Sequence, residues 1–244
     1  GIDNRGYDGL AQQQLDQSVP PDWNEAYVIA ADLAPEHPLV VADTPMHGPN
    51  VWPADMVGWR HQIEAFYETA RLVSPLLLRA IALSLDLEER HFDRFITEPI
   101  ATLRMLHYPP AAAGMPPGQV GAGAHTDWGA VSFVVQRGEP GLQVQLEDGS
   151  WLDVEPDPAA IVVNLGDLMA RWTNDRYRST VHRVLSPTRT SRYSMAFFMD
   201  LDYHARVQCL PTCTDADNPP RYPATTAGEH LMAKYRAAMA SSGL

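Results

Sequence analysis

Seven short runs rich in β-branched and aromatic residues follow one another along the second half of the chain, with turn-forming residues between them. The runs are 102–108, 131–136, 142–146, 151–154, 161–165, 178–185 and 192–199. Segments such as 137–141 (RGEPG) and 186–191 (SPTRTS) separate them, and 111–124 indicates a loop of small residues. Strands this short and closely spaced favour a β-sandwich or barrel over a parallel α/β sheet. The sequence therefore predicts a mainly β protein with flanking helices.

The N-terminal part shows a different pattern. Apolar residues recur at three- and four-residue steps over 55–87, which indicates one face of an amphipathic helix. Pro75 lies inside this run and predicts a kink or break. The segment 87–95 has acidic residues in its first turn and indicates a second short helix. Residues 1–53 are rich in turn formers, and only 27–31 indicates a strand.

Length and composition fit one domain. The chain has 244 residues, of which 45% are hydrophobic, and this is enough for a well-buried core. We expect a single domain over 1–244. It would contain an irregular and helical part at 1–100, a β core at about 101–205 and a C-terminal helix at about 227–240.

Charge and cysteine content exclude several classes of partner. The formal net charge is −12, whereas nucleic acids and anionic membranes require a basic face. No run of 18 apolar residues indicates a membrane span. Cys209 and Cys213 are too few for a disulfide framework, which favours a reducing, cytoplasmic location. We expect a small-molecule substrate, and the sequence does not define an oligomeric state.

The segment AHTDWGA (124–130) carries the strongest chemical signal. His125 and Asp127 are two residues apart, so an extended strand would present both side chains on one face. His182, 55 residues beyond Asp127, offers a third ligand from another strand. Two histidines and one carboxylate on one side of a metal leave the other side open, as in non-haem Fe(II) oxygenases. A surface turn and a core histidine would fit the same residues.

A second pair of residues adds an anion site. Arg192 and Ser194 are also two apart, in SRYSMAFFMD (191–200), and would share one strand face. A buried arginine needs an anionic partner. A guanidinium with a hydroxyl beside it is suited to a ligand carboxylate, through charge-assisted hydrogen bonds.

Together these motifs resemble the isopenicillin N synthase-like family of 2-oxoglutarate/Fe(II)-dependent dioxygenases. The resemblance rests on HTD at 125–127, the distal His182, RYS at 192–194 and the segment 164–184, and it covers roughly 103–229. It implies a double-stranded β-helix, which is a jelly roll, for the β core. Family members usually carry a strand and a helix ahead of an RGY-like segment. RGY stands at 5–7 here, so we expect that section to be absent.

The resemblance also implies roles for individual residues. Arg192 and Ser194 would bind the distal carboxylate of 2-oxoglutarate, and Tyr108 matches a tyrosine that assists in the family. Many members carry asparagine two residues before this tyrosine, whereas this chain has Leu106. Two residues are candidates for the substrate pocket. Trp128 is next to the HTD motif, and Phe198 is six residues beyond Arg192, so that both would lie on the same face of the strand.

The implied reaction is Fe(II)- and 2-oxoglutarate-dependent oxidation of a small molecule, by hydroxylation or related C–H oxidation, with release of succinate and CO2. The implied cofactors are Fe(II), 2-oxoglutarate as cosubstrate and O2, with ascorbate as an optional support. Two alternatives remain open on the sequence. One is a 2-oxoglutarate-independent Fe(II) oxidase of the same fold, and the other is a non-catalytic metal-binding jelly roll.

Overall fold

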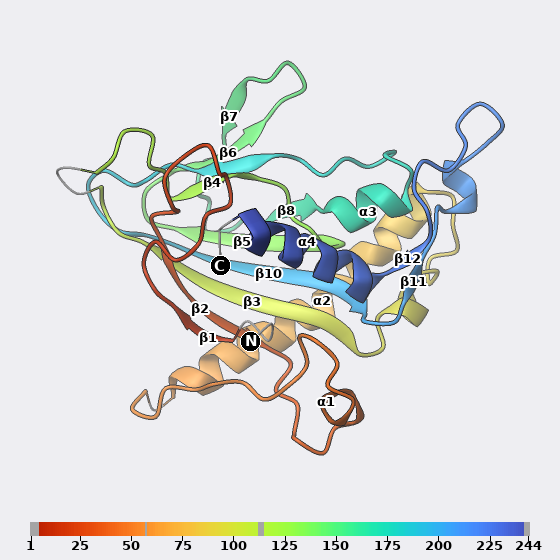
Figure 1. Cartoon of the computed structure of the whole chain (residues 1–244), viewed down its shortest axis with the longest axis horizontal. Helices are drawn as coiled ribbons and strands as arrows, with labels where there is room; N and C mark the ends of the chain where they lie inside the picture. The colour runs from red at the N-terminus through yellow and green to blue at the C-terminus, as the bar shows by residue number, and fades with distance from the viewer. Residues whose placement is uncertain (1–4, 57, 112–114, 242–244) are drawn as a thin grey trace.

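Two antiparallel β-sheets form the centre of the molecule (Figure 1). The structure is a computed structural model that describes residues 5–56, 58–111 and 115–241. The larger sheet contains, in spatial order, β1 (Gly6–Asp8), β2 (Glu25–Ala30), β3 (Pro99–Tyr108), β10 (Arg192–Asp202), β5 (Val131–Arg137) and β8 (Val162–Leu165). The smaller sheet contains β4 (Ala122–His125), β9 (His182–Val184), β6 (Leu142–Gln145) and β7 (Trp151–Asp153). This two-sheet core confirms the prediction of a mainly β jelly roll.

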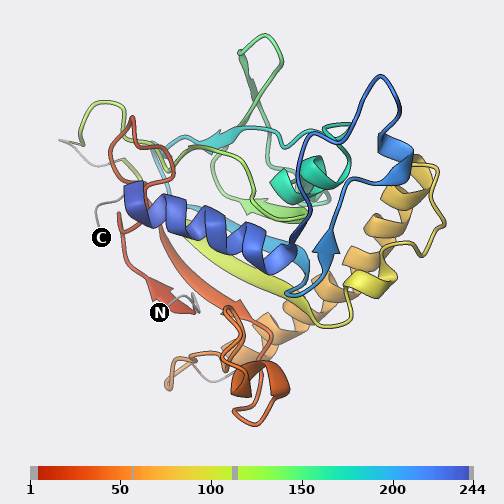
Figure 2. The same ribbon diagram turned by 45° about the vertical axis from the view of Figure 1, so that its right-hand side comes forward.

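Helices flank this core. They are α1 (Pro38–Val41), α2 (Trp59–Ser84), α3 (Asp167–Trp172) and α4 (Ala227–Ser241), and a small ladder joins β11 (Arg206–Val207) to β12 (Thr225–Thr226). Both views show α2 behind the larger sheet and α4 in front of it (Figures 1 and 2). No helix in the described part of the chain combines the length and apolar character that crossing a bilayer requires.

The long helix α2 differs from its predicted form, because it continues through Pro75 without a break. Packing explains this continuity. The helix buries Tyr67 before the proline and Leu78 after it, and tertiary contacts of this kind outweigh one lost backbone hydrogen bond. Tyr67 meets Phe197 of β10 edge to face, with 5.4 Å between ring centroids. The second predicted helix, at 87–95, is reduced to a 3-10 turn at Asp93–Phe95.

The two strands that carry His125 and His182 also differ from prediction. β4 occupies the end of the segment 111–124, where we expected only a loop; residues 112–114 lie outside the described residues. β9 is confined to His182–Val184 rather than 178–185. β9 pairs with β4 on one side and with β6 on the other, and the pairing of β4 with β9 shifts register within four residues. Such irregularity re-aims side chains.

The N-terminal segment 9–24 is tied to β4 and to the residues before it. Asp22, which is fully buried, accepts hydrogen bonds from the backbone N–H groups of Gly123 at 2.7 Å and Leu15 at 3.2 Å. Asn24 donates its side-chain N–H to the carbonyl of Gly121 at 2.7 Å. A Cβ on Gly123 would lie 2.7 Å from the Cβ of Asp16, so this close approach requires glycine. The segment therefore depends on one buried carboxylate.

We predict that Asp22→Ala lowers the free energy of unfolding by about 1–3 kcal/mol, because two backbone donors lose their acceptor. Burial raises the pKa of Asp22 from 3.8 to about 6. The folded state therefore binds more protons between these values, and the contribution of Asp22 to stability falls as the pH rises through that window. Urea unfolding at pH 5 and pH 7.5 should show a smaller loss at pH 7.5.

Asp16→Ala is the matched control for this measurement. Asp16 lies in the same segment, and its carboxylate accepts hydrogen bonds from Ser18 in an exposed turn. Its substitution should change the free energy of unfolding by less than about 0.5 kcal/mol. Equal losses for the two variants, or a loss for Asp22→Ala that grows with pH, would contradict the assignment.

Candidate active site

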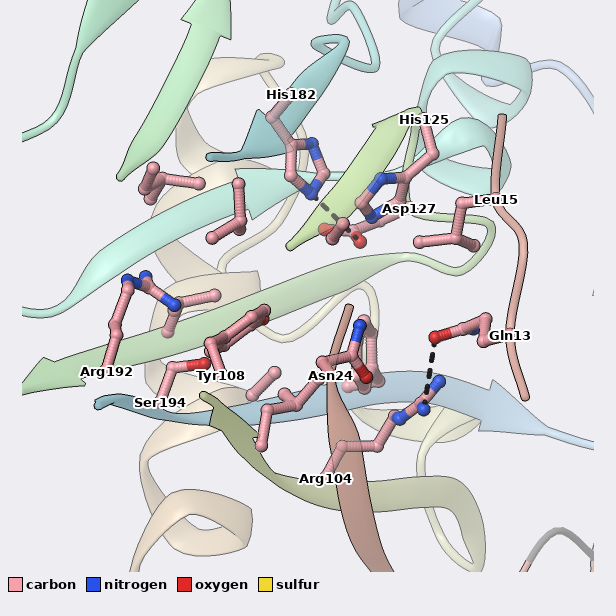
Figure 3. Close-up of a pocket in the computed structure, with 17 residues that line it drawn as sticks. Gln13, Leu15, Asn24, Arg104, Tyr108, His125, Asp127, His182, Arg192 and Ser194 are labelled. Carbon is pink, nitrogen blue, oxygen red and sulfur yellow. Dashed lines mark hydrogen bonds and ion pairs between the residues drawn. The ribbon is translucent and has the colours of Figure 1, made fainter. Parts of the chain in front are cut away.

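Three potential metal ligands converge inside the core (Figure 3). His125 ends β4 and His182 begins β9, and the two residues are direct partners in the antiparallel register. Asp127 follows two residues after His125. One ligand atom from each of the three side chains lies within 4.8 Å of the others, and His182 Nε2 is 3.7 Å from Asp127 Oδ1. The sequence prediction that these residues come together is confirmed.

Asp127 reaches the cluster from a loop and not from a strand face, because β4 ends at His125. Ser132 of β5 donates a hydrogen bond to Asp127 Oδ2, and the backbone carbonyl of Asp127 accepts one from Asp167 N at 2.8 Å. The loop turns tightly at Gly129, where a Cβ would lie 1.7 Å from Asp200 Oδ1. The carboxylate is thus held by Ser132 on β5, and the backbone of Asp127 is held by Asp167 on α3.

Both imidazoles are oriented by backbone carbonyls. His125 Nδ1 lies 2.7 Å from the carbonyl oxygen of Gly123, and His182 Nδ1 lies 3.0 Å from that of Thr180. Because a carbonyl only accepts, each Nδ1 carries the hydrogen and each Nε2 keeps its lone pair for a metal. Burial, followed by the neighbouring His182, lowers the pKa of His125 to about 4. The ring is therefore neutral at pH 7, as a ligand must be.

The ligand set fits Fe(II). Two imidazole nitrogens and one carboxylate on one side of a cation form the facial arrangement of non-haem iron sites. Among the described residues no thiolate takes part in the cluster, and thiolates would favour zinc.

Arg192 lies on β10 facing the same interior space. It is 1% exposed, and its Nη2 donates to Gln136 Oε1 at 2.8 Å. Its Nε and Nη1 are buried and have no hydrogen-bond partner among the described residues. The guanidinium stands over the ring of Tyr108, 4.7 Å from the centroid, and Ser194 is buried two residues further along β10. A buried cation with two free donors requires an anion, so the residues fit a carboxylate.

These side chains border one hollow, which we call the site hollow and define by His125, Asp127, His182, Arg192 and Phe198 among its lining residues. It encloses about 580 Å³ of space, part of which is open to solvent. Ser194 and Tyr108 also line it.

The two pocket candidates lie in different places. Phe198 lines the site hollow. Trp128 packs instead against Tyr235 of α4, edge to face at 4.9 Å, beside a small apolar cluster that includes Met46 and Leu231. The side chain of Trp128 is not among the described side chains that border the hollow, and its substrate role stays a prediction.

Sequence reasoning missed five side chains that complete the site: Ser132, Gln136, Arg104, Gln13 and Asn24. The sequence could have indicated Arg104, because it is four residues from Tyr108 and therefore lies on the same face of the strand. Gln136 faces Ser194 in the register of β5 with β10, which requires the pairing to be known. Gln13 and Asn24 give no local signal, since they reach the hollow from the distant N-terminal segment 9–24.

The known proteins that this chain resembles belong to one family. The family model of the 2OG-Fe(II) oxygenase superfamily matches residues 99–201. The 2-oxoglutarate-Fe(II) type oxidoreductase hxnY of Emericella nidulans is 37% identical over 242 residues, which cover 96% of this chain and 68% of that protein. The 2-oxoglutarate-dependent dioxygenase citB of Monascus ruber is 39% identical, over 83% of this chain and 64% of that protein.

Solved structures support the same relationship. A full-length Neurospora crassa protein in complex with alpha-KG and thymine superposes with a TM-score of 0.84 at 31% identity, covering 97% of this chain and 75% of that one. JOX2 in complex with 2OG, Fe and JA superposes with a TM-score of 0.77 at 26% identity, covering 93% and 64%. The chain thus belongs to the 2OG-Fe(II) oxygenase superfamily and is a non-haem Fe(II)- and 2-oxoglutarate-dependent oxidoreductase.

Proposed function

We propose that His125, Asp127 and His182 hold Fe(II) and that Arg192 and Ser194 bind the distal carboxylate of 2-oxoglutarate for the oxidation of a small molecule. The observation that carries this assignment is the buried guanidinium of Arg192. Its Nε and Nη1 lack partners among the described residues, inside the hollow that the metal ligands border. An anionic cosubstrate bound there would satisfy both donors.

When bound together, Fe(II), 2-oxoglutarate and O2 would supply an oxidation in which 2-oxoglutarate takes up one oxygen atom of O2 and becomes succinate and CO2, while the other oxygen atom oxidises a C–H bond of the substrate, by hydroxylation or a related reaction. The chain positions these reactants. Arg192 is fixed by Gln136, and the ring of Tyr108 covers one face of its guanidinium. Ser194 adds a hydroxyl on the same strand face. Ser132 holds the carboxylate of Asp127 in position.

We further propose a domain organisation, a substrate contact and a cellular setting. Residues 1–244 would act as one oxygenase domain, with the helical part at 1–100, the jelly roll at about 101–205 and the C-terminal helix at about 227–240. Phe198 lines the hollow and would contact substrate. We also propose a reducing, cytoplasmic setting, since Cys209 and Cys213 are free thiols, and no nucleic-acid or membrane partner, given the charge of −12.

The relatives support a small-molecule substrate, and the hollow that the metal ligands border is where it would bind. The Neurospora crassa relative binds thymine in its solved complex, which supports a small-molecule substrate here. The relatives named as 2-oxoglutarate-dependent enzymes do not favour a 2-oxoglutarate-independent oxidase or a non-catalytic jelly roll.

We predict that Asp127→Ala lowers Fe(II) affinity by at least about 100-fold, because loss of a direct ligand exceeds the effect of losing a supporting contact. The measurement is an anaerobic titration of Fe(II) with 2-oxoglutarate present, followed by the visible charge-transfer band of the Fe(II)–2-oxoglutarate complex. Succinate release should disappear in parallel.

Asp153→Ala serves as the control, since Asp153 is an exposed carboxylate on β7 of the same small sheet. It should bind Fe(II) like the wild type. An unchanged charge-transfer band in Asp127→Ala would remove this residue from the metal site.

We predict that Arg192→Met raises the dissociation constant of 2-oxoglutarate by about 10–100-fold, the worth of one or two charge-assisted hydrogen bonds. Fe(II) binding should change little, because Arg192 is not a ligand. The test is a titration of the Fe(II) protein with 2-oxoglutarate under anaerobic conditions.

Arg189→Met is the matched control, because the side chain of Arg189 is 83% exposed just before β10. If Arg192→Met were saturated by 2-oxoglutarate at the same concentrations as the wild type, Arg192 would not bind the cosubstrate.

A further inference from the structure

A second arginine faces the site hollow at the end away from Arg192. Arg104 and Tyr108 lie on the same face of β3, four residues apart, and β10 pairs with this strand so that Arg192 is opposite Tyr108 and Ala196 is opposite Arg104. Four residues of extended strand span about 13 Å, so the two guanidinium groups serve different parts of the hollow. Figure 3 shows them at opposite ends, with the metal ligands above the space between them.

The hydrogen bonds of Arg104 leave donor capacity unused. Its Nη2 contacts Gln13 Oε1 at 3.2 Å and Asp8 Oδ2 at 3.4 Å, both near the long limit for such bonds. Its Nε is buried and has no partner among the described residues. The Arg104 side chain is 15% exposed, whereas that of Asp8 is 41% exposed, so water screens the carboxylate of this pair. A largely buried guanidinium with a free donor is a site for an acceptor.

The neighbours of Arg104 leave room for a ligand and supply an apolar surface. Ala196, its partner across the strands, is small and fills little of the hollow. Leu15 and Phe198 line the same space, and Asn24 adds a polar group beside Gln13. This end of the hollow therefore combines one strong donor with apolar walls close to the metal ligands, which is typical of sites that orient a small molecule.

We propose that Arg104 is a specificity-determining residue that binds an oxygen acceptor of the substrate, either a carboxylate or a carbonyl. The apolar body of the substrate would then lie along Leu15 and Phe198, next to the position of the metal. This inference rests on the proposed function, since it assumes that 2-oxoglutarate occupies the Arg192 end. It gives Arg104 no part in holding iron or cosubstrate.

The test uses three probes of similar shape: 4-fluorobenzoate, 4-fluorobenzamide and 4-fluorotoluene. Their binding to the anaerobic Fe(II) protein, saturated with 2-oxoglutarate, is measured by fluorine NMR. We expect the wild type to bind at least one of the two oxygen-bearing probes about 10-fold or more tightly than 4-fluorotoluene. Preference for 4-fluorobenzoate would identify a carboxylate, and preference for 4-fluorobenzamide a carbonyl.

Arg104→Met, which keeps chain length without a donor, should abolish this preference, and Arg104→Gln, which keeps a polar group, should reduce it. Arg189→Met should retain it. In all variants the charge-transfer band with 2-oxoglutarate should remain, which also shows that the protein is folded. If Arg104→Met loses the band, the test rests on Arg104→Gln, which should show a smaller preference for the oxygen-bearing probes than the wild type.

Three outcomes would overturn the proposal: equal binding of all probes by the wild type, an unchanged preference in both Arg104 variants, or displacement of 2-oxoglutarate by 4-fluorobenzoate, which would place the acceptor at Arg192. Failure of the proposed function gives a different result. In that case the wild type itself shows no charge-transfer band with Fe(II) and 2-oxoglutarate.

Discussion

The pairing of β4 with β9 is the interaction on which the site depends. It places His125 directly opposite His182, and this register brings the two rings to a centroid separation of 4.3 Å. A slip of either strand by one residue would turn its imidazole to the other face of the sheet, away from its partner. The carbonyls of Gly123 and Thr180, which orient the rings, belong to the same two chain segments, so ligand position and ligand tautomer are fixed together.

The larger sheet contributes charge rather than metal ligands. Its central strands β3 and β10 present Arg104 and Arg192 to a hollow with apolar walls, and each arginine keeps a donor without a partner among the described residues. Unsatisfied buried donors are costly to the folded protein, and their presence at two separate points is explained by two acceptors, one from the cosubstrate and one from the substrate. The smaller sheet thus supplies the two histidine ligands, whereas the larger sheet supplies the two arginines and, through Ser132, supports Asp127.

The contrast between prediction and structure is greatest where packing overrides local preference. Pro75 predicted a break, yet α2 continues because Tyr67 and Leu78 anchor it on either side. Asp127 was expected on a strand, yet it lies in a loop that Ser132 and Gly129 shape. The three side chains converge in spite of this, with one ligand atom of each within 4.8 Å of the others.

The sequence alone determined the mainly β fold, the three metal ligands and the anion site at Arg192. The two-residue spacings of His125 with Asp127 and of Arg192 with Ser194 are local signals, whereas His182 stands in a separate motif 55 residues beyond Asp127. Strand parity places Arg104 on the face of Tyr108, but only the tertiary structure decided which groups surround Arg104 and where Trp128 lies. Gln13 meets Arg104 across 91 residues of chain, and Trp128 turns toward Tyr235 on α4. Contacts of that separation depend on how whole elements pack, which no local pattern records.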